Sequence, residues 1–275
     1  EMDRFADAET LLHAARDVLA QTGHAQEVAR ADLNLGLLAY RQGHYQAALH
    51  HLETAHQGFE AIGNQADVAF ADLTRSSIYR RLNLVPETIT LATSAERTFN
   101  RHSMPAYEVL GLMNRAAAYR QQNEWTQAAR LLSRARRIAR RQGAGRRVLE
   151  IDLERAAVAF EEGQPERAGR LARRLARMMD AQTWPSLAAR VHLLCARCAL
   201  ARSPNDLTLA RTATLQALEL TATYGLREET WQVHGLRAQR LELEGDMNQA
   251  LQAYLQAVAA LELWRGMLHV DEFQI

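Results

Sequence analysis

The sequence contains no lysine, so all 33 of its basic residues are arginine. It has two cysteines and five prolines, and aromatic residues make up only 6% of the chain. Two cysteines cannot form a disulfide framework, which predicts a reducing compartment, the cytoplasm. No apolar run is long enough to span a bilayer, and the N-terminus lacks a secretory pattern, so neither a membrane protein nor a secreted one is expected.

The residues that are abundant favour helices. Hydrophobic residues make up 48% of the chain, and Ala, Leu, Arg, Glu and Gln dominate it. Straight side chains keep their rotamer freedom in a helix, and Ala has none to lose. No stretch alternates β-branched or aromatic residues with polar ones, as a strand would. The formal net charge of +1 gives the chain as a whole no general attraction for nucleic acid.

A repeat runs along the whole sequence. Residues suited to the left-handed backbone that closes a helix recur with a spacing of 40, and finally 42, at Gly43, Asn83, Asn123, Gly163, Ser203 and Gly245. A second set marks the links between repeats, at Gly23, Gly63, Gly143 and Gly225. The two sets predict helices of roughly 17 residues, or four to five turns. The longer spacing falls at Ser203–Asp206, where Asn205 or Asp206 is expected to cap the next helix.

A small residue follows each turn with the same period, at Ala8, Ala48, Thr88, Ala128, Ala168, Ala210 and Ala250. Four and seven residues later come Leu12/Ala15, Leu52/Ala55, Ala92/Ala95, Leu132/Ala135, Ala172/Leu175, Thr214/Ala217 and Tyr254/Ala257. Spacing of i, i+4 and i+7 places these residues on one helical stripe. We expect this stripe to be the buried face of the second helix in each repeat.

These residues resemble the tetratricopeptide repeat (TPR) family. The resemblance is carried by Leu35-Gly36 with Tyr40, Gly43, Tyr45, Ala48, Leu52 and Ala55, and by Arg115–Tyr119 with Asn123, Trp125, Ala128, Leu132 and Ala135. It departs from the family in its period of about 40 instead of 34 residues. The first-helix Trp and the Pro that ends the second helix are also absent. The resemblance implies an all-α fold, a TPR-like right-handed α-solenoid of antiparallel helix pairs.

The repeat register predicts that residues 1–275 form a single solenoid. We expect a leading half-repeat at 1–23, repeats at about 24–63, 64–103, 104–143, 144–183, 184–225 and 226–266, and a tail at 267–275. Because the chain begins within a second helix and ends without a polar cap, we expect it to be part of a longer protein.

The C-terminal residues resemble a junction to a further domain. Trp264, Arg265 and Leu268, followed by Asp271-Glu272, resemble the place where bacterial TPR proteins lead into a CHAT domain, a caspase-like peptidase. That resemblance implies that the peptidase His and Cys lie beyond Ile275. The repeat region of a transcriptional regulator of the maltose-activator type is an alternative. In both cases this segment would be a sensor or docking arm of a bacterial signalling protein.

In this family the first helices line a concave groove, which implies partner-binding residues at Asn34, Tyr40, Arg41, Arg80, Arg81, Asn114, Arg120 and Gln121. A lining of polar, aromatic and Arg side chains suits recognition of a protein or peptide. Asn34 and Asn114 stand two periods apart, and their amides could bond both donors and acceptors of an extended peptide. The alternative is that this face is only solvated.

A second set of arginines is also periodic, at Arg75, Arg115, Arg155 and Arg237. Stacked repeats would bring these residues into a ladder. Asp72 and Asp152 precede Arg75 and Arg155 by three residues, which is close enough for ion pairs. The ladder is either structural, with its guanidinium groups paired inside the scaffold, or an edge that captures carboxylates of a partner.

Two second helices are predicted to carry basic faces on the convex side, formed by Arg130, Arg134, Arg137 and Arg141 and by Arg167, Arg170, Arg174 and Arg177. Such rows could contact a nucleic acid or an acidic protein. No aromatic residues are interleaved for base stacking. A solvated surface is therefore favoured, and nucleic acid is disfavoured as a partner.

No pattern of residues predicts catalysis. His192, Cys195 and Cys198 stand at i, i+3 and i+6, but no second ligand pair completes a metal site, so we interpret them as core residues. The sequence has no phosphate loop, zinc-protease motif or nucleophile elbow. We therefore expect no cofactor, no metal and no enzyme activity within these residues. The predicted function is a scaffold that binds a protein or peptide partner.

Overall fold

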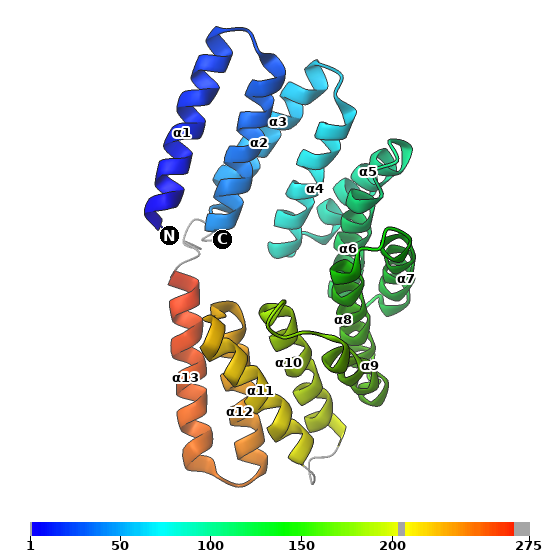
Figure 1. Ribbon diagram of the computed structural model, residues 1–275, viewed down its shortest axis with the longest axis vertical. Helices are drawn as coiled ribbons and strands as arrows, with labels where there is room; N and C mark the ends of the chain where they lie inside the picture. The colour runs from blue at the N-terminus through cyan, green and yellow to red at the C-terminus, as the bar shows by residue number, and fades with distance from the viewer. Residues whose placement is uncertain (1, 203–206, 267–275) are drawn as a thin grey trace. The chain divides into compact units, whose positions relative to one another are not determined.

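The computed structural model describes residues 2–202 and 207–266, and every regular element in these ranges is an α-helix, as predicted (Figure 1). The chain divides into two compact units between Gly143 and Ala144. The first unit contains α1 (Met2–Gln21), α2 (Ala25–Gln42), α3 (Tyr45–Ala61), α4 (Gln65–Arg81), α5 (Val85–Arg101), α6 (Pro105–Gln121) and α7 (Trp125–Arg141). The second contains α8 (Gly145–Glu161), α9 (Pro165–Met178), α10 (Pro185–Arg202), α11 (Thr208–Tyr224), α12 (Arg227–Leu243) and α13 (Met247–Gly266).

Within each unit, consecutive helices run antiparallel and pack against one another (Figure 1). The even-numbered helices are the first helices of the repeats. The first five of them, α2, α4, α6, α8 and α10, begin at residues 25, 65, 105, 145 and 185. In the first unit α2 contacts α4 and α4 contacts α6, so first helices of successive repeats lie side by side. Side chains on neighbouring first helices can therefore reach one another.

Left-handed residues close the helices where the sequence predicts. Gly43, Asn83 and Asn123 have φ values of 86°, 58° and 62°. Ser103 has φ 54° and stands where a glycine would continue the series Gly23, Gly63 and Gly143. No left-handed residue was predicted here from the sequence. Asn and Ser have short polar side chains, and Asn in particular tolerates this conformation. The expected turn at Ser203 and cap at Asn205 or Asp206 lie outside the described residues.

One helix is shorter than predicted. α9 has 14 residues instead of about 17, and Met179 after it is extended, with φ −96° and ψ 137°. The Asp180 carboxylate accepts a hydrogen bond from the Gln182 backbone N–H at 3.0 Å and another from the Thr183 hydroxyl. Because such side-chain bonds compete with helical ones, they stabilise an irregular link to α10 in place of another helical turn.

The small position of the second helices is the tightest point of the packing. Ala48, Thr88, Ala128 and Ala168 are completely buried. The Thr88 hydroxyl, in the place of a methyl group, donates to the Leu84 carbonyl at 2.7 Å and so stays satisfied. These positions confirm the predicted stripe in the internal second helices of the two units.

Two terminal helices depart from the predicted stripe. Tyr254 of α13 is 38% exposed and donates its hydroxyl to Glu242 at 2.8 Å, because α13 packs on α12 through Ala250 and Ala253 instead. In α1, Ala15 is exposed because this helix packs mainly on α2. The assignment of Tyr254 and Ala15 to the buried stripe was wrong.

The packing at the small position predicts the effect of enlarging it. Ala128→Leu should overpack α7 against its neighbours and lower the free energy of unfolding by about 1–3 kcal/mol. Urea unfolding followed by circular dichroism measures this. Ala129 is exposed on the same helix, so Ala129→Leu is the matched control and should change stability by less than about 0.5 kcal/mol. Equal stability of the two variants would contradict the register.

Candidate functional site

The predicted partner-binding residues all lie on first helices of the first unit. α2 carries Asn34, Tyr40 and Arg41, α4 carries Arg80 and Arg81, and α6 carries Asn114, Arg120 and Gln121. Because α2 contacts α4 and α4 contacts α6, these residues belong to three neighbouring helices.

Tyr40 and Arg81 connect α2 to α4. The Arg81 Nε donates a hydrogen bond to the Tyr40 hydroxyl at 3.0 Å, and the Arg81 guanidinium carbon lies 5.6 Å from the centroid of the tyrosine ring. A cation over an aromatic face at an exposed site contributes about 0.5–1 kcal/mol. Arg81 is exposed and Tyr40 half-buried, so the contact holds a charged group and an aromatic ring together at the surface.

Two amide side chains connect α4 to α6. Gln121 Nε2 donates to the backbone carbonyl of Arg80 at 3.0 Å, in addition to the hydrogen bond that this carbonyl accepts from the Asn83 backbone N–H at 3.3 Å. Asn114 Nδ2 donates to the hydroxyls of Ser76 and Ser77 at 2.9 and 2.8 Å. The amide N–H groups of Asn114 thus bond within the scaffold, whereas Asn34 is exposed on α2.

The ends of these three helices gather positive charge. Arg41, Arg80, Arg81 and Arg120 lie in the last turns of α2, α4 and α6. A cation near a helix C-terminus is favoured by the helix dipole, by about 0.3–1 kcal/mol when exposed. Arg41 and Arg81 are exposed, and Arg80 and Arg120 are half-buried. The surface is therefore basic as well as rich in hydrogen-bond donors.

The arginines of the predicted ladder make contacts inside their own units. Arg75 pairs with Glu53 at 2.6 Å and with Asp72 at 3.2 Å, and Arg155 pairs with Asp152 at 2.9 Å. The expected pairs of Asp72 with Arg75 and of Asp152 with Arg155 are confirmed. The remaining ladder residues also have partners: Arg115 pairs with Glu96, and Arg237 lies 3.5 Å from Gln256.

A network of buried charges joins α5, α6 and α7. Glu96 and Glu108 are only 4% and 5% exposed. Arg134 donates one hydrogen bond to each of these carboxylates at 2.6 Å, and Arg115 donates to Glu96. Asn100 donates to Glu108 at 3.2 Å. Arg134, predicted to belong to a solvated basic face, is instead half-buried, because two glutamates that the sequence reading missed pair with it.

The network replaces a pairing found in the earlier repeats. Asp32 of α2 accepts from Arg16 at 2.6 Å, and Asp72 of α4 bonds His56 at 2.9 Å, each pair standing 16 residues apart. One period later the acid position holds Leu112 and the basic position holds Glu96. In this repeat the buried acid, Glu96, lies on the second helix instead of the first. The presence of Leu112 where the earlier repeats have Asp is the feature of the sequence that indicates the change.

Burial has a measurable effect on the acid of the second repeat. Removal from water raises the pKa of the Asp72 carboxyl above its ordinary value, while His56 and Arg75 act in the opposite direction. Burial also lowers the pKa of His192 and His234, which occupy the matching position in α10 and α12. The position is therefore an enclosed one in both units.

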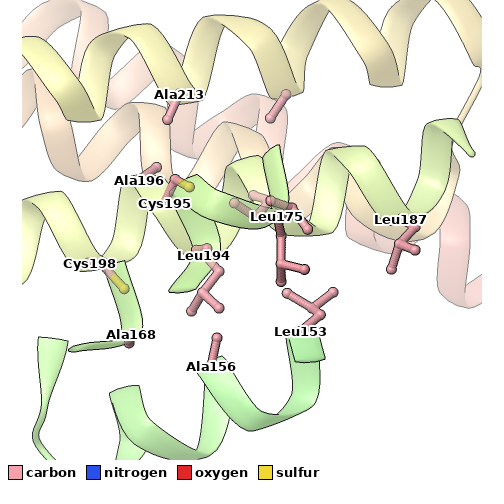
Figure 2. Packing of buried hydrophobic residues seen from close by; sticks show 14 of the residues in the cluster. Leu153, Ala156, Ala168, Leu175, Leu187, Leu194, Cys195, Ala196, Cys198 and Ala213 are labelled. Carbon is pink, nitrogen blue, oxygen red and sulfur yellow. The ribbon is translucent and has the colours of Figure 1, made fainter. Parts of the chain in front are cut away.

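The two cysteines lie in the core of the second unit, as interpreted from the sequence. Figure 2 shows Cys195 and Cys198 of α10 among Ala and Leu side chains. Cys198 is fully buried, and its Cβ would lie 3.3 Å from a Cβ added at Gly169 of α9. Burial raises the pKa of Cys195 to about 11 and that of Cys198 to about 12, so both thiols stay protonated at neutral pH.

In the part of the chain that the structure describes, no helix has the length and hydropathy to cross a membrane, and no His, Cys, Asp and Glu side chains are grouped to hold a metal ion. The basic residues Arg130, Arg137 and Arg141 of α7 are exposed. In the predicted junction, Leu268, Asp271 and Glu272 lie outside the described residues.

The chain matches no protein-family model and no curated protein sequence. It is similar to solved structures that share little of its sequence. The apo form of RapI superimposes with a TM-score of 0.77 at 12% identity, covering 95% of this chain and 93% of that one. The apo form of the quorum sensor NprR from B. thuringiensis gives 0.73 at 15% identity, covering 94% and 72%.

The Rap conjugation gene regulator of the plasmid pLS20, in complex with a peptide, gives a TM-score of 0.66 at 12% identity, covering 94% of this chain and 80% of that one. At these identities the similarity establishes the fold. This chain is a TPR-like α-solenoid. The predicted fold class, all-α with antiparallel helix pairs, is confirmed.

The buried charges predict unequal effects of two arginine substitutions on α7 and α6. Arg115→Gln should lower the free energy of unfolding by roughly 1–3 kcal/mol, because buried Glu96 loses one of its two charged partners. Arg137→Gln, at an exposed position, is the control and should stay within about 0.5 kcal/mol of the parent. Urea unfolding at neutral pH compares them, and an unchanged Arg115→Gln protein would show that the pair contributes nothing.

The raised thiol pKa values predict low cysteine reactivity. At pH 8 a thiol with a pKa of about 11 is ionised in only about one molecule in a thousand. A thiol reagent such as DTNB should therefore label neither Cys195 nor Cys198 in the native protein over minutes. It should label both in denaturant, where they are exposed. Fast labelling of the native protein would contradict the burial of α10.

Proposed function

We propose that this chain recognises a peptide, or an extended segment of a partner protein, on the first-helix surface formed by α2, α4 and α6. The carrying observation is that polar side chains connect these three helices into one surface, through Tyr40 with Arg81 and Gln121 with Arg80. The peptide held by the similarly folded pLS20 regulator supports this proposal. The chain supplies binding and orientation, and it carries out no chemistry itself.

The surface has the chemistry that an extended peptide requires. A peptide backbone presents one carbonyl acceptor per residue, and the guanidinium groups of Arg41 and Arg81 are donors. The part of the Tyr40 ring that Arg81 does not cover offers an aromatic contact for an apolar side chain, at a low cost in side-chain entropy. The exposed amide of Asn34 has both a donor and an acceptor. Asn114 instead positions α6 against α4 through its serine contacts.

A second part of the proposal concerns the larger protein to which this surface would belong. We propose that the chain is the sensor or docking arm of a larger bacterial signalling protein in the cytoplasm. A single solenoid over residues 1–275, with the repeat boundaries given above, stays a prediction, as does a CHAT domain beyond Ile275. The transcriptional regulator is the alternative context.

A selection experiment tests the proposed surface. Random 12-residue peptides carrying a photo-crosslinking residue are selected for binding to the chain, and their crosslinks are mapped by mass spectrometry. Crosslinks should fall on α2, α4 and α6. Tyr40→Ala combined with Arg81→Ala should weaken binding at least about tenfold, which corresponds to about 1.4 kcal/mol, because it removes an aromatic contact and a charged donor.

The matched control substitutes exposed residues of a second helix in the same unit, Gln127→Ala with Arg137→Ala. This variant should bind the selected peptides with unchanged affinity. Crosslinks confined to second helices, or equal losses in the two double variants, would overturn the proposed surface. Circular dichroism of each variant excludes unfolding as the cause.

A further inference from the structure

A row of arginines runs along the exposed face of α9 in the second unit. Arg167, Arg170, Arg174 and Arg177 are all exposed. Their spacing of three, four and three residues keeps them within about a quarter of the helix circumference, over a length of about 15 Å. Glu166 is the one acidic residue of this 14-residue helix, and its carboxylate lies 4.0 Å from Arg170. Positive charge therefore dominates this face.

A comparison with α7 shows why the charge of Arg174 remains at the surface. Arg134 of α7 stands at the same repeat position as Arg174, 40 residues earlier, and its guanidinium pairs with the buried Glu96 and Glu108. Forty residues after those glutamates the sequence has Arg136 and Val148. Neither side chain can accept a hydrogen bond from the Arg174 guanidinium or carry the negative charge that would pair with it. The second unit thus retains the arginine at a position whose internal acidic partners are absent.

The residues beside the row define the shape of a suitable partner. Met178 is 61% exposed and Leu171 is half-buried, and both lie along the edge of the arginine row. Helices that pack side by side repeat their contacts at alternating intervals of three and four residues, and these arginines follow the same alternation. An acidic helix with carboxylates at i, i+3 or i+4, i+7 and i+10 would offer one carboxylate to each of the four guanidinium groups, and its apolar edge would cover Met178.

We propose that the α9 row, formed by Arg167, Arg170, Arg174 and Arg177, docks an acidic amphipathic helix of a partner protein. This surface is separate from the peptide surface proposed for the first unit and does not depend on it. A nucleic acid fits it less well, because α9 contains no aromatic residue for stacking on bases and the row is only one helix wide. Charge complementarity would make the docking fast and sensitive to salt.

Fluorescence anisotropy with defined probes tests this proposal. The first probe is a labelled 21-residue helical peptide with Glu at i, i+3, i+7 and i+10 and Leu on the adjoining edge. The second has the same composition in scrambled order, and the third is a 21-nucleotide DNA in single-stranded and duplex form. The ordered peptide should bind at least about fivefold more tightly than the scrambled one and more tightly than either DNA at 0.15 M salt.

Charge reversal identifies the surface. Arg170→Glu with Arg174→Glu should weaken binding of the ordered peptide at least about tenfold, because two attractions become repulsions. Arg130→Glu with Arg137→Glu makes the same change in net charge on exposed positions of α7 and should change the affinity less than about twofold. Thermal melting of both variants confirms that they are folded.

Each contrary outcome overturns the proposal. No binding to any probe would leave the row as solvated surface, and equal binding of ordered and scrambled peptides would show general attraction by charge. Tighter binding of DNA would assign the row to nucleic acid. Equal losses in the two reversal variants would remove α9 as the site. The peptides selected on the first unit should bind the α9 variant normally, which separates the two proposals.

Discussion

Close packing at one small residue in each internal second helix controls how near the helices of a repeat can approach. Ala48, Thr88, Ala128 and Ala168 have no exposed surface, and a side chain larger than Thr would push neighbouring helices apart. In the first unit the first helices of successive repeats are also in contact, α2 with α4 and α4 with α6. The contacts of Tyr40 with Arg81, and of Gln121 with the Arg80 carbonyl, depend on the closeness of these helices.

The same close packing encloses carboxylates that must then be paired. A charge removed from water costs several kcal/mol unless hydrogen bonds and an opposite charge compensate for it. The repeats solve this in different ways, with Arg16 on Asp32, His56 on Asp72, and Arg115 with Arg134 on Glu96. Asp32 and Asp72 each pair with a residue 16 positions earlier, whereas Glu96 and Glu108 share Arg134, so the pairing pattern differs between repeats.

The two proposed surfaces follow from the two kinds of helix. First helices in the first unit bring donors and an aromatic ring together from three separate segments of the chain. The α9 row comes from one helix of the second unit, and Arg174 in it has no acid at the positions that match Glu96 and Glu108. Arginines at matching positions thus serve different purposes, and the surroundings of each guanidinium decide between an internal ion pair and an outward-facing charge.

Local patterns in the sequence determined the helices, their period and most of the buried stripe. Turn residues such as Gly43 and Asn83, and small residues such as Ala128, act through backbone conformation and side-chain volume, which are properties of the residue itself. The tertiary structure decided the partners of the charged groups. Arg134 meets Glu96 across 38 residues of sequence, and Arg81 meets Tyr40 across 41. The packing of α13 on α12 that leaves Tyr254 exposed also depends on a neighbouring helix. Such choices follow from distances between segments, which a periodic sequence does not specify.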